Sequence, residues 1–195
     1  MERWLLLEPL HLAHGFGDLH ARQCEPVRLG RRRQLFAYGQ VDLGNALFQN
    51  NETILDLVYI HIAKPWAFAT GFQYTHVPAI PSIGALTPAS TTGGGMLLNY
   101  SFGDNSPLAG VSLPVRLEYI SSTGSLADGA PNLLYGPGST AWSITVPPTY
   151  QYKIFFARVE FSHVGATSTT PGLVFGPGGT NTTQTRGLFE IGILF

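Results

Sequence analysis

The chain has few charged residues, a single cysteine and no long hydrophobic run, and each shortage excludes a class of protein. Charged residues make up 12% of the 195 residues, against roughly 25% in an average soluble domain. The formal net charge is −1, so no bulk positive charge attracts a nucleic acid. Cys24 is the only cysteine, which excludes an intramolecular disulfide. No window approaches the ~18 uninterrupted apolar residues that a membrane helix needs.

Apolar and turn-forming residues are abundant instead. Hydrophobic residues make up 44% of the chain and aromatic residues 12%, beside 23 Gly and 14 Pro. An apolar, charge-poor chain without a spanning helix is either a soluble β-fold with a buried core or a membrane β-barrel. In a barrel only alternate residues need to be apolar, so the mean hydropathy stays modest. The length suggests one domain.

Residues 1–34 show neither strand nor helix periodicity, and we expect an irregular N-terminal extension there. Exported proteins begin with a charged segment, an apolar core of 7–15 residues and a small-residue cleavage site. The apolar run after Met1 ends at Glu8 and Pro9, and no such site follows. This start favours a fragment of a longer protein.

Residues 35–195 alternate apolar and polar side chains with a period of two, which is the signature of β-strands. The runs are about ten residues long, the length of a tilted strand that crosses a bilayer. The predicted strands are 35–43, 53–62, 66–77, 94–102, 111–121, 141–150, 154–165 and 185–195. Both faces of 53–62 are apolar, so its outward face stays open. The pattern predicts an all-β fold, a transmembrane antiparallel up-and-down β-barrel of about eight strands, complete or as part of a larger barrel.

The connections between these strands alternate in length. The long ones, rich in Gly, Pro, Ser and Thr, are 78–93, 122–140 and 166–184. The short ones are 64–65, 103–110 and 151–153. Membrane barrels have short periplasmic turns and long external loops, so we expect the three long connections to be external. Two of them share a sequence, LLYGPGST at 133–140 and LVFGPGGT at 173–180.

Aromatic residues fall near both ends of the predicted strands, with aliphatic residues between them. Rings with a polar edge prefer the headgroup boundary, which produces two girdles around an aliphatic band. A soluble sandwich has no physical reason to layer its aromatics in this way. The predicted membrane-interface aromatics are Trp66, Phe68, Tyr74, Tyr100, Phe102, Tyr119, Trp142, Tyr150, Phe155, Phe161 and Phe195.

Six charged residues lie on the polar faces of three predicted strands: Arg116, Glu118, Arg158, Glu160, Arg186 and Glu190. An Arg that points into lipid at mid-depth costs ~2–4 kcal/mol, so this face should be wet or internally paired. In a wide barrel these residues would line the pore and tune which solutes pass. In a narrow closed barrel they would fill the interior as a ladder of cross-strand ion pairs. About eight strands leave room only for side chains and ~16 leave a channel, so both interpretations stay open.

No group of residues assembles a nucleophile, a general base or a metal site, and we do not expect an enzyme. The extension carries four residues with metal-ligating atoms: His11, His14, His20 and Cys24. Their spacing matches no standard zinc pattern. The Gly-rich loops lack the context of a phosphate cradle. We therefore expect no catalytic residue, no metal and no cofactor.

Five segments carry a resemblance to a known family. They are FQYTHVP at 72–78, LEYISSTG at 117–124, NLLYGPG at 132–138, YQYKIFFA at 150–157 and TRGLFEIGILF at 185–195. From about residue 50 to its end, the chain resembles the OmpL-like β-barrel porins of bacterial outer membranes. The resemblance implies an integral outer-membrane barrel with a water-filled lumen, and it assigns no catalytic residue. The last strand, ending at Phe195, resembles the C-terminal strands that the barrel-insertion machinery reads.

These observations predict an outer-membrane porin that allows passive diffusion of small hydrophilic solutes. The expected partners are outer-membrane lipid, the insertion machinery and the solutes, without nucleic acid, and a homo-oligomer stays open. One alternative is a small non-conducting barrel whose loops serve structure or adhesion. Another is a soluble carbohydrate-binding β-sandwich, which would need its apolar face buried between two sheets.

Overall fold

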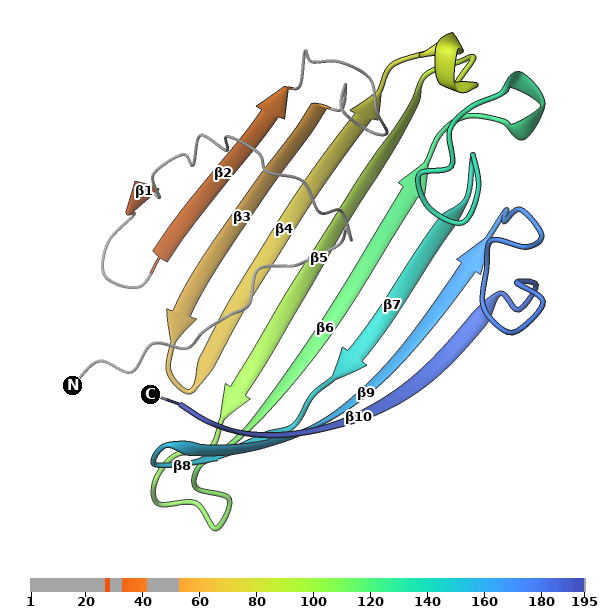
Figure 1. Ribbon diagram of the computed structural model, residues 1–195. Coiled ribbons are helices and arrows are strands. Elements are labelled where there is room, and N and C mark those ends of the chain that lie inside the picture. Colours follow the sequence, from red (N-terminus) through yellow and green to blue (C-terminus); the bar gives the residue numbers. More distant parts are fainter. Residues whose placement is uncertain (1–26, 29–32, 42–52, 195) are drawn as a thin grey trace.

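A computed structural model describes residues 27–28, 33–41 and 53–194, and these form one antiparallel sheet (Figure 1). Its strands are β1 (Val27–Arg28), β2 (Arg33–Val41), β3 (Thr53–Ala63), β4 (Trp66–Val77), β5 (Ala89–Ser101), β6 (Val111–Ser122), β7 (Thr140–Val146), β8 (Thr149–Tyr152), β9 (Phe155–Thr167) and β10 (Thr183–Ile193). Two short 3-10 helices, η1 (Pro81–Ile83) and η2 (Leu126–Asp128), lie in the connections. Among the described residues, no helix has the length and apolar character needed to cross a membrane.

Each strand pairs with its neighbours in the sequence, which gives an up-and-down order. The predicted strand 141–150 is split into β7 and β8, and both parts lie between β6 and β9. Pro147 and Pro148 separate the parts, because proline has no N–H to donate to a ladder. The two-residue β1 can be set aside, and β7 and β8 can be counted as one strand. The ten strands then amount to eight. The all-β, antiparallel prediction is confirmed.

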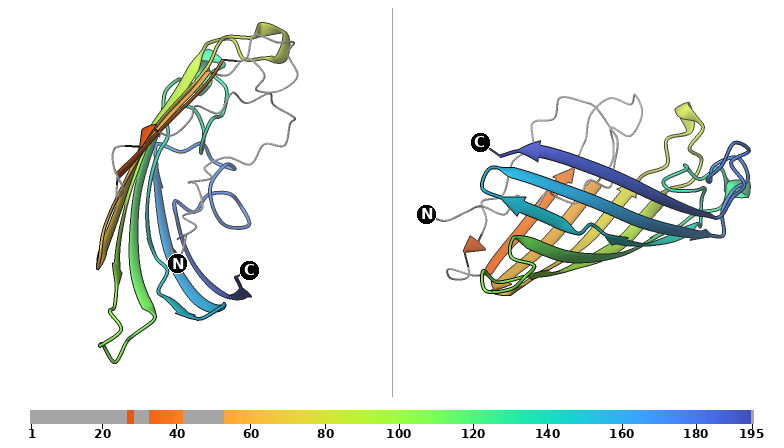
Figure 2. Two further views of the ribbon diagram at one scale, coloured as in Figure 1. Left: turned by 90° about the vertical axis from the view of Figure 1, so that its left-hand side faces the viewer. Right: turned by 90° about the horizontal axis from the view of Figure 1, so that it is seen from below.

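The sheet is strongly curved (Figure 2). Within the described part of the chain, β10 pairs only with β9, and β2 pairs only with β1 and β3. The long connections 123–139 and 168–182 lie at one end of the sheet, and the short turns lie at the other. The curvature gives the sheet a concave and a convex face.

β5 begins at Ala89, five residues before the strand that the alternation predicts, so the predicted loop 78–93 ends at Pro88. The pattern fails there because three consecutive glycines, at 93–95, interrupt the alternation that marks a strand. Gly95 lies directly opposite Glu118 of β6. A Cβ at Gly95 would lie 3.2 Å from Cγ of Glu118, so a larger residue at this position would crowd the Glu118 side chain.

Two elements also reach into the segment that the sequence predicts to be irregular. β1 lies wholly within residues 1–34, and β2 begins at Arg33. The register of β1 with β2 places Val27 opposite Leu35.

Directly opposite residues of an antiparallel pair share a face, and the register places most large apolar side chains of β4 to β10 on one side. The other face keeps a minority of them, which includes Ile54, Val58, Ile60 and Ile62 of β3, Leu97 of β5, Ile120 of β6 and Leu188 of β10. In β3 the question left open by the sequence is settled, because Leu57 lies opposite Phe72 and Leu55 opposite Tyr74. The odd-numbered residues of β3 therefore belong to the apolar face.

This apolar face is convex, and no other described element covers it (Figure 2). The described residues form a single sheet, so no second layer packs on it, and the arrangement needed by a β-sandwich is not found. Ile191 is 70% exposed and Phe161 is 60% exposed. Other exposed members include Leu55, Phe72, Leu98, Leu117, Trp142, Ile144 and Phe189.

The buried hydrophobic residues are small and gather at the loop end of the sheet. They are Val77, Ala85, Ala89, Ala130, Ala141 and Ala166. Each lies at the loop-side end of a strand or within a long connection. The densest packing of the molecule is therefore around the loops rather than between layers.

Candidate functional site

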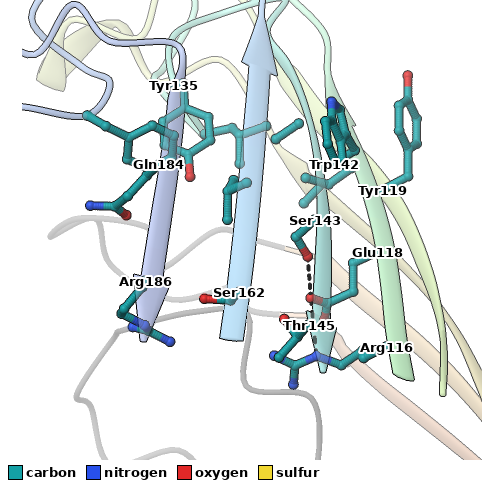
Figure 3. Close-up of a pocket in the computed structure, with 15 residues that line it drawn as sticks. Arg116, Glu118, Tyr119, Tyr135, Trp142, Ser143, Thr145, Ser162, Gln184 and Arg186 are labelled. Atoms are coloured by element: carbon teal, nitrogen blue, oxygen red, sulfur yellow. Dashed lines mark hydrogen bonds and ion pairs between the residues drawn. The ribbon is translucent and has the colours of Figure 1, made fainter. Parts of the chain in front are cut away.

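All six charged residues predicted to line a pore lie on the same face, opposite the apolar one. The register aligns Arg116 with Thr145, Thr145 with Ser162 and Ser162 with Arg186 across four neighbouring strands. Glu118 lies opposite Ser143 in the next row. Figure 3 shows these side chains beneath loop residues that fold over the concave side.

Two charges of this face pair along one strand. The guanidinium Nε of Arg116 lies 3.4 Å from Oε2 of Glu118, two residues further along β6. The same carboxylate oxygen accepts a hydrogen bond of 2.7 Å from the hydroxyl of Ser143. Neighbouring Thr145 is 2% exposed, so small hydroxyl residues pack closely around this pair.

The other four charges pair between β9 and β10. Arg158 lies directly opposite Glu190, and its Nε donates a 3.0 Å hydrogen bond to Oε2 of that carboxylate. Arg186 reaches diagonally to Glu160, with 3.2 Å between Nη2 and Oε1. The six side chains thus form three ion pairs with no net formal charge. That they line a pore stays a prediction.

Several uncharged members of this face were not singled out by the sequence. Ser143, Thr145 and Ser162 line the same cavity as Arg116 and Glu118, together with Gln184. Hydroxyl residues at alternating strand positions are too common to mark a site. Only the cross-strand register brings these residues together.

Most of the predicted interface aromatics lie toward the two ends of the convex face. Near the short turns, the ring centroids of Trp66 and Tyr100 are 4.8 Å apart, and those of Tyr100 and Phe102 are 5.0 Å apart. Tyr150 and Phe155 occupy the same end. Phe68 lies two residues beyond Trp66 along β4. Near the loops are Tyr74, Tyr119 and Trp142, whereas Phe161 lies in the middle of β9, opposite Val146. Phe195 lies outside the described residues.

The two connections with similar sequences meet over the concave face. Tyr135 and Phe175 occupy equivalent positions in the two segments, and their ring centroids are 5.1 Å apart with the planes tilted by 64°. The backbone N–H of Thr170 donates to the carbonyl of Tyr135 over 2.9 Å. Burial raises the pKa of the Tyr135 phenol above its ordinary value.

The first of these connections is held by a buried serine. The hydroxyl of Ser139 donates to the carbonyl of Gly136 over 2.7 Å and accepts the N–H of Tyr135 over 3.1 Å. Ser139 is fully buried, and Ser122 donates to its carbonyl over 3.0 Å. These bonds fix the backbone on both sides of the Tyr135 ring.

The second connection is held by backbone pairs. Phe175 and Asn181 exchange two hydrogen bonds of 3.0 Å each, and Gly172 donates to Gly179 over 2.8 Å. The two loops therefore have defined structures and pack on one another.

A cavity of about 230 Å³ lies between the loops and the polar face (Figure 3). Leu134, Tyr135 and Phe175 form its loop side. The strand side is mixed. Its charged and polar members are Arg116, Glu118, Ser143, Thr145, Ser162, Gln184 and Arg186, and its apolar and aromatic members are Tyr119, Ile120, Ala141, Trp142 and Val164.

The four residues considered as metal ligands, His11, His14, His20 and Cys24, lie outside the described residues. In the part of the chain that the structure describes, no group of three or more His, Cys, Asp or Glu could hold a metal ion. The site is thus a set of ion pairs, hydroxyls and two aromatic rings.

Comparison with known proteins gives one family. A family model described as "Putative beta-barrel porin-2, OmpL-like" matches residues 33–195. No curated protein and no solved structure gives a significant match. The matched range contains every strand from β2 to β10, all three ion pairs and both loops of the cavity.

Proposed function

Because the chain belongs to the OmpL-like family of β-barrel porins, we propose that it carries small hydrophilic solutes by passive diffusion across a bacterial outer membrane. The observation that supports this most is the opposition of the two faces of one sheet. The convex face exposes large apolar side chains, while the concave face carries ion pairs and hydroxyls. Lipid outside and water inside match this opposition.

The charged residues of the concave face would line the passage with both positive and negative side chains. Arg116, Arg158 and Arg186 each have a carboxylate partner, so the lining carries no net charge from these residues. A balanced lining favours size over charge as the basis of selection. In this proposal the cross-strand ion pairs border an open passage and do not fill a narrow closed barrel.

A pore also requires a closed sheet, because hydrocarbon cannot satisfy the backbone groups of a free edge. We propose that the edge of β10, and the edge of β2 beyond its short pairing with β1, pair with strands outside the described sheet. A second copy of the chain is one source of such strands. The solute-carrying assembly is then a barrel wider than this sheet alone could enclose.

Outer-membrane lipid and the insertion machinery complete the proposal as partners. The aromatic residues at both ends of the convex face would contact the headgroups. The terminal strand, ending at Phe195, would be the segment that the insertion machinery reads. The chain would have no catalytic role and need no cofactor.

Conductance measurements on the full-length protein in planar bilayers test this function. We expect discrete channel steps whose amplitude grows with salt concentration. A protein that enters liposomes and yields no channels would be a non-conducting barrel, the alternative function. Tyr135 and Phe175 of two of the loops pack on each other over the concave face, which an adhesive role would not require.

A further inference from the structure

We propose that the cavity beneath Tyr135 and Phe175 binds a neutral, hydroxyl-rich solute the size of a single sugar ring. The inference rests on the proposed function, because it names the class of solute that the passage holds at this point. It concerns residues that the family match leaves without a role.

The loop side of the cavity suits the apolar face of such a ring. Leu134, Tyr135 and Phe175 supply carbon surface there, and the two aromatic rings are tilted by 64° rather than stacked. A tilted pair leaves aromatic surface for a third flat group. Ligand pockets generally combine such apolar walls with a few placed polar groups.

The strand side of the cavity suits the hydroxyl groups. Arg116 and Arg186 only donate hydrogen bonds, Glu118 only accepts them, and Ser143, Ser162 and Gln184 do both. A hydroxyl is itself both donor and acceptor. A polyhydroxylated ring can therefore satisfy these groups in several orientations.

The charges around the cavity disfavour an ionic solute. Arg116 is paired with Glu118 at 3.4 Å, and Arg186 is paired with Glu160 at 3.2 Å. An anion would have to compete with carboxylates already in place, and a cation would face the guanidinium groups. A neutral solute meets neither obstacle.

The volume and rigidity of the cavity suit a small solute. About 230 Å³ is below the roughly 300–1,000 Å³ of pockets for drug-sized ligands. The loop side is fixed by Ser139 and by the backbone pair of Phe175 with Asn181. A preformed site loses little ordering entropy on binding, so a single ring should bind without rearrangement of the loops.

Binding of D-glucose to the full chain in detergent micelles tests the site, with glucuronate and glucosamine as anionic and cationic sugars of similar size. We expect glucose to bind more tightly than either charged sugar. Tyr135→Ala should weaken glucose binding about tenfold through lost aromatic contact. Leu126→Ala changes an exposed residue in the same connection that does not line the cavity, and it should leave binding unchanged.

A second variant covers the case in which Tyr135→Ala fails to fold. Gln184→Leu changes an exposed strand residue of the cavity and should also weaken glucose binding, with a wild-type circular dichroism spectrum. Wild-type affinity in a folded Tyr135→Ala or Gln184→Leu protein would overturn the proposed site. Tighter binding of glucuronate or glucosamine than of glucose would also overturn it.

Planar bilayers with the same preparations separate this inference from the porin function. If glucose binding depends on Tyr135 and no channel steps appear, the sugar site is supported and the porin function is contradicted. Channel steps in a protein that binds no glucose would keep the passage and overturn the site.

Discussion

The two faces of the sheet are built from the same strands, yet they differ in every property that matters for solvation. On β7, Ile144 of the convex face is exposed, with Leu117 opposite it on β6 and His163 opposite it on β9. One residue earlier, Ser143 of the concave face donates a hydrogen bond to Glu118. A single step along the chain therefore separates a surface suited to hydrocarbon from one suited to water. Neighbouring residues of one strand therefore face different surroundings. Substitutions at two adjacent positions can test which surroundings each face has.

The largest effect should come from placing a charge on the convex face. Ile144→Arg should destabilise the protein in lipid vesicles by about 2–4 kcal/mol, the cost of an arginine near the bilayer midplane. Its neighbour Ser143→Arg is the matched control, because it places the same charge beside Glu118 on the other face. Urea unfolding in vesicles measures both. Equal losses for the two variants would remove the distinction between the faces.

The next effect concerns the best-connected charge of the concave face. Glu118→Leu removes the partner of both Arg116 and Ser143 and should cost about 1–3 kcal/mol, as expected when a hydrogen-bonded group loses its partner. Glu160→Leu is the comparison, since its partner Arg186 has a side chain that is 65% exposed. An exposed pair contributes about 0.2–1 kcal/mol, so this variant should be milder. The reverse order in urea unfolding would contradict the packing of the Arg116 pair.

Much of this contrast could be predicted from the sequence, and some of it could not. The period of two placed Arg158 and Glu190 on one face and Val159 on the other, because alternation follows directly from strand geometry. It could not assign the faces of β3, where Ile54 and Leu55 are both apolar. Only the register, which puts Leu55 opposite Tyr74, decides that strand.

The pairing of the charges and the cavity were also beyond the sequence pattern. Arg186 contacts Glu160 diagonally rather than the residue directly opposite, and no sequence separation predicts that choice. The meeting of Tyr135 with Phe175 depends on two irregular loops whose shapes are set by Ser139 and by backbone bonds. The similarity of the two loop sequences was the one available signal, and it did not reveal their contact.

A smaller effect should appear in ion selectivity. This measurement tests whether the concave face lines the path along which ions pass. Glu190→Gln leaves Arg158 without its carboxylate and should shift the reversal potential in a salt gradient toward anion selectivity. Asp128→Asn makes the same change of charge in the exposed helix η2 and serves as the control. Identical shifts for the two variants would mean that the face does not line the path of ions.

The smallest effect concerns pH. Burial raises the pKa of Tyr135 above the ordinary tyrosine value of 10.0, so above that pH the unfolded chain loses this proton before the folded one. The free energy of unfolding should therefore fall as pH rises from 10 toward the folded pKa. Urea unfolding at about pH 9 and about pH 11 should show a smaller loss in Tyr135→Phe than in the wild type. An equal loss of unfolding free energy in Tyr135→Phe and the wild type would mean that the Tyr135 phenol is not buried in the folded protein.

The outer edge of β10 bears on the proposed passage through a membrane. That strand bonds to β9 alone in the described sheet, and every unbonded amide on its other side would cost several kcal/mol in hydrocarbon. If the chain spans a bilayer as proposed, we expect this edge to gain its partner strand during insertion rather than after it.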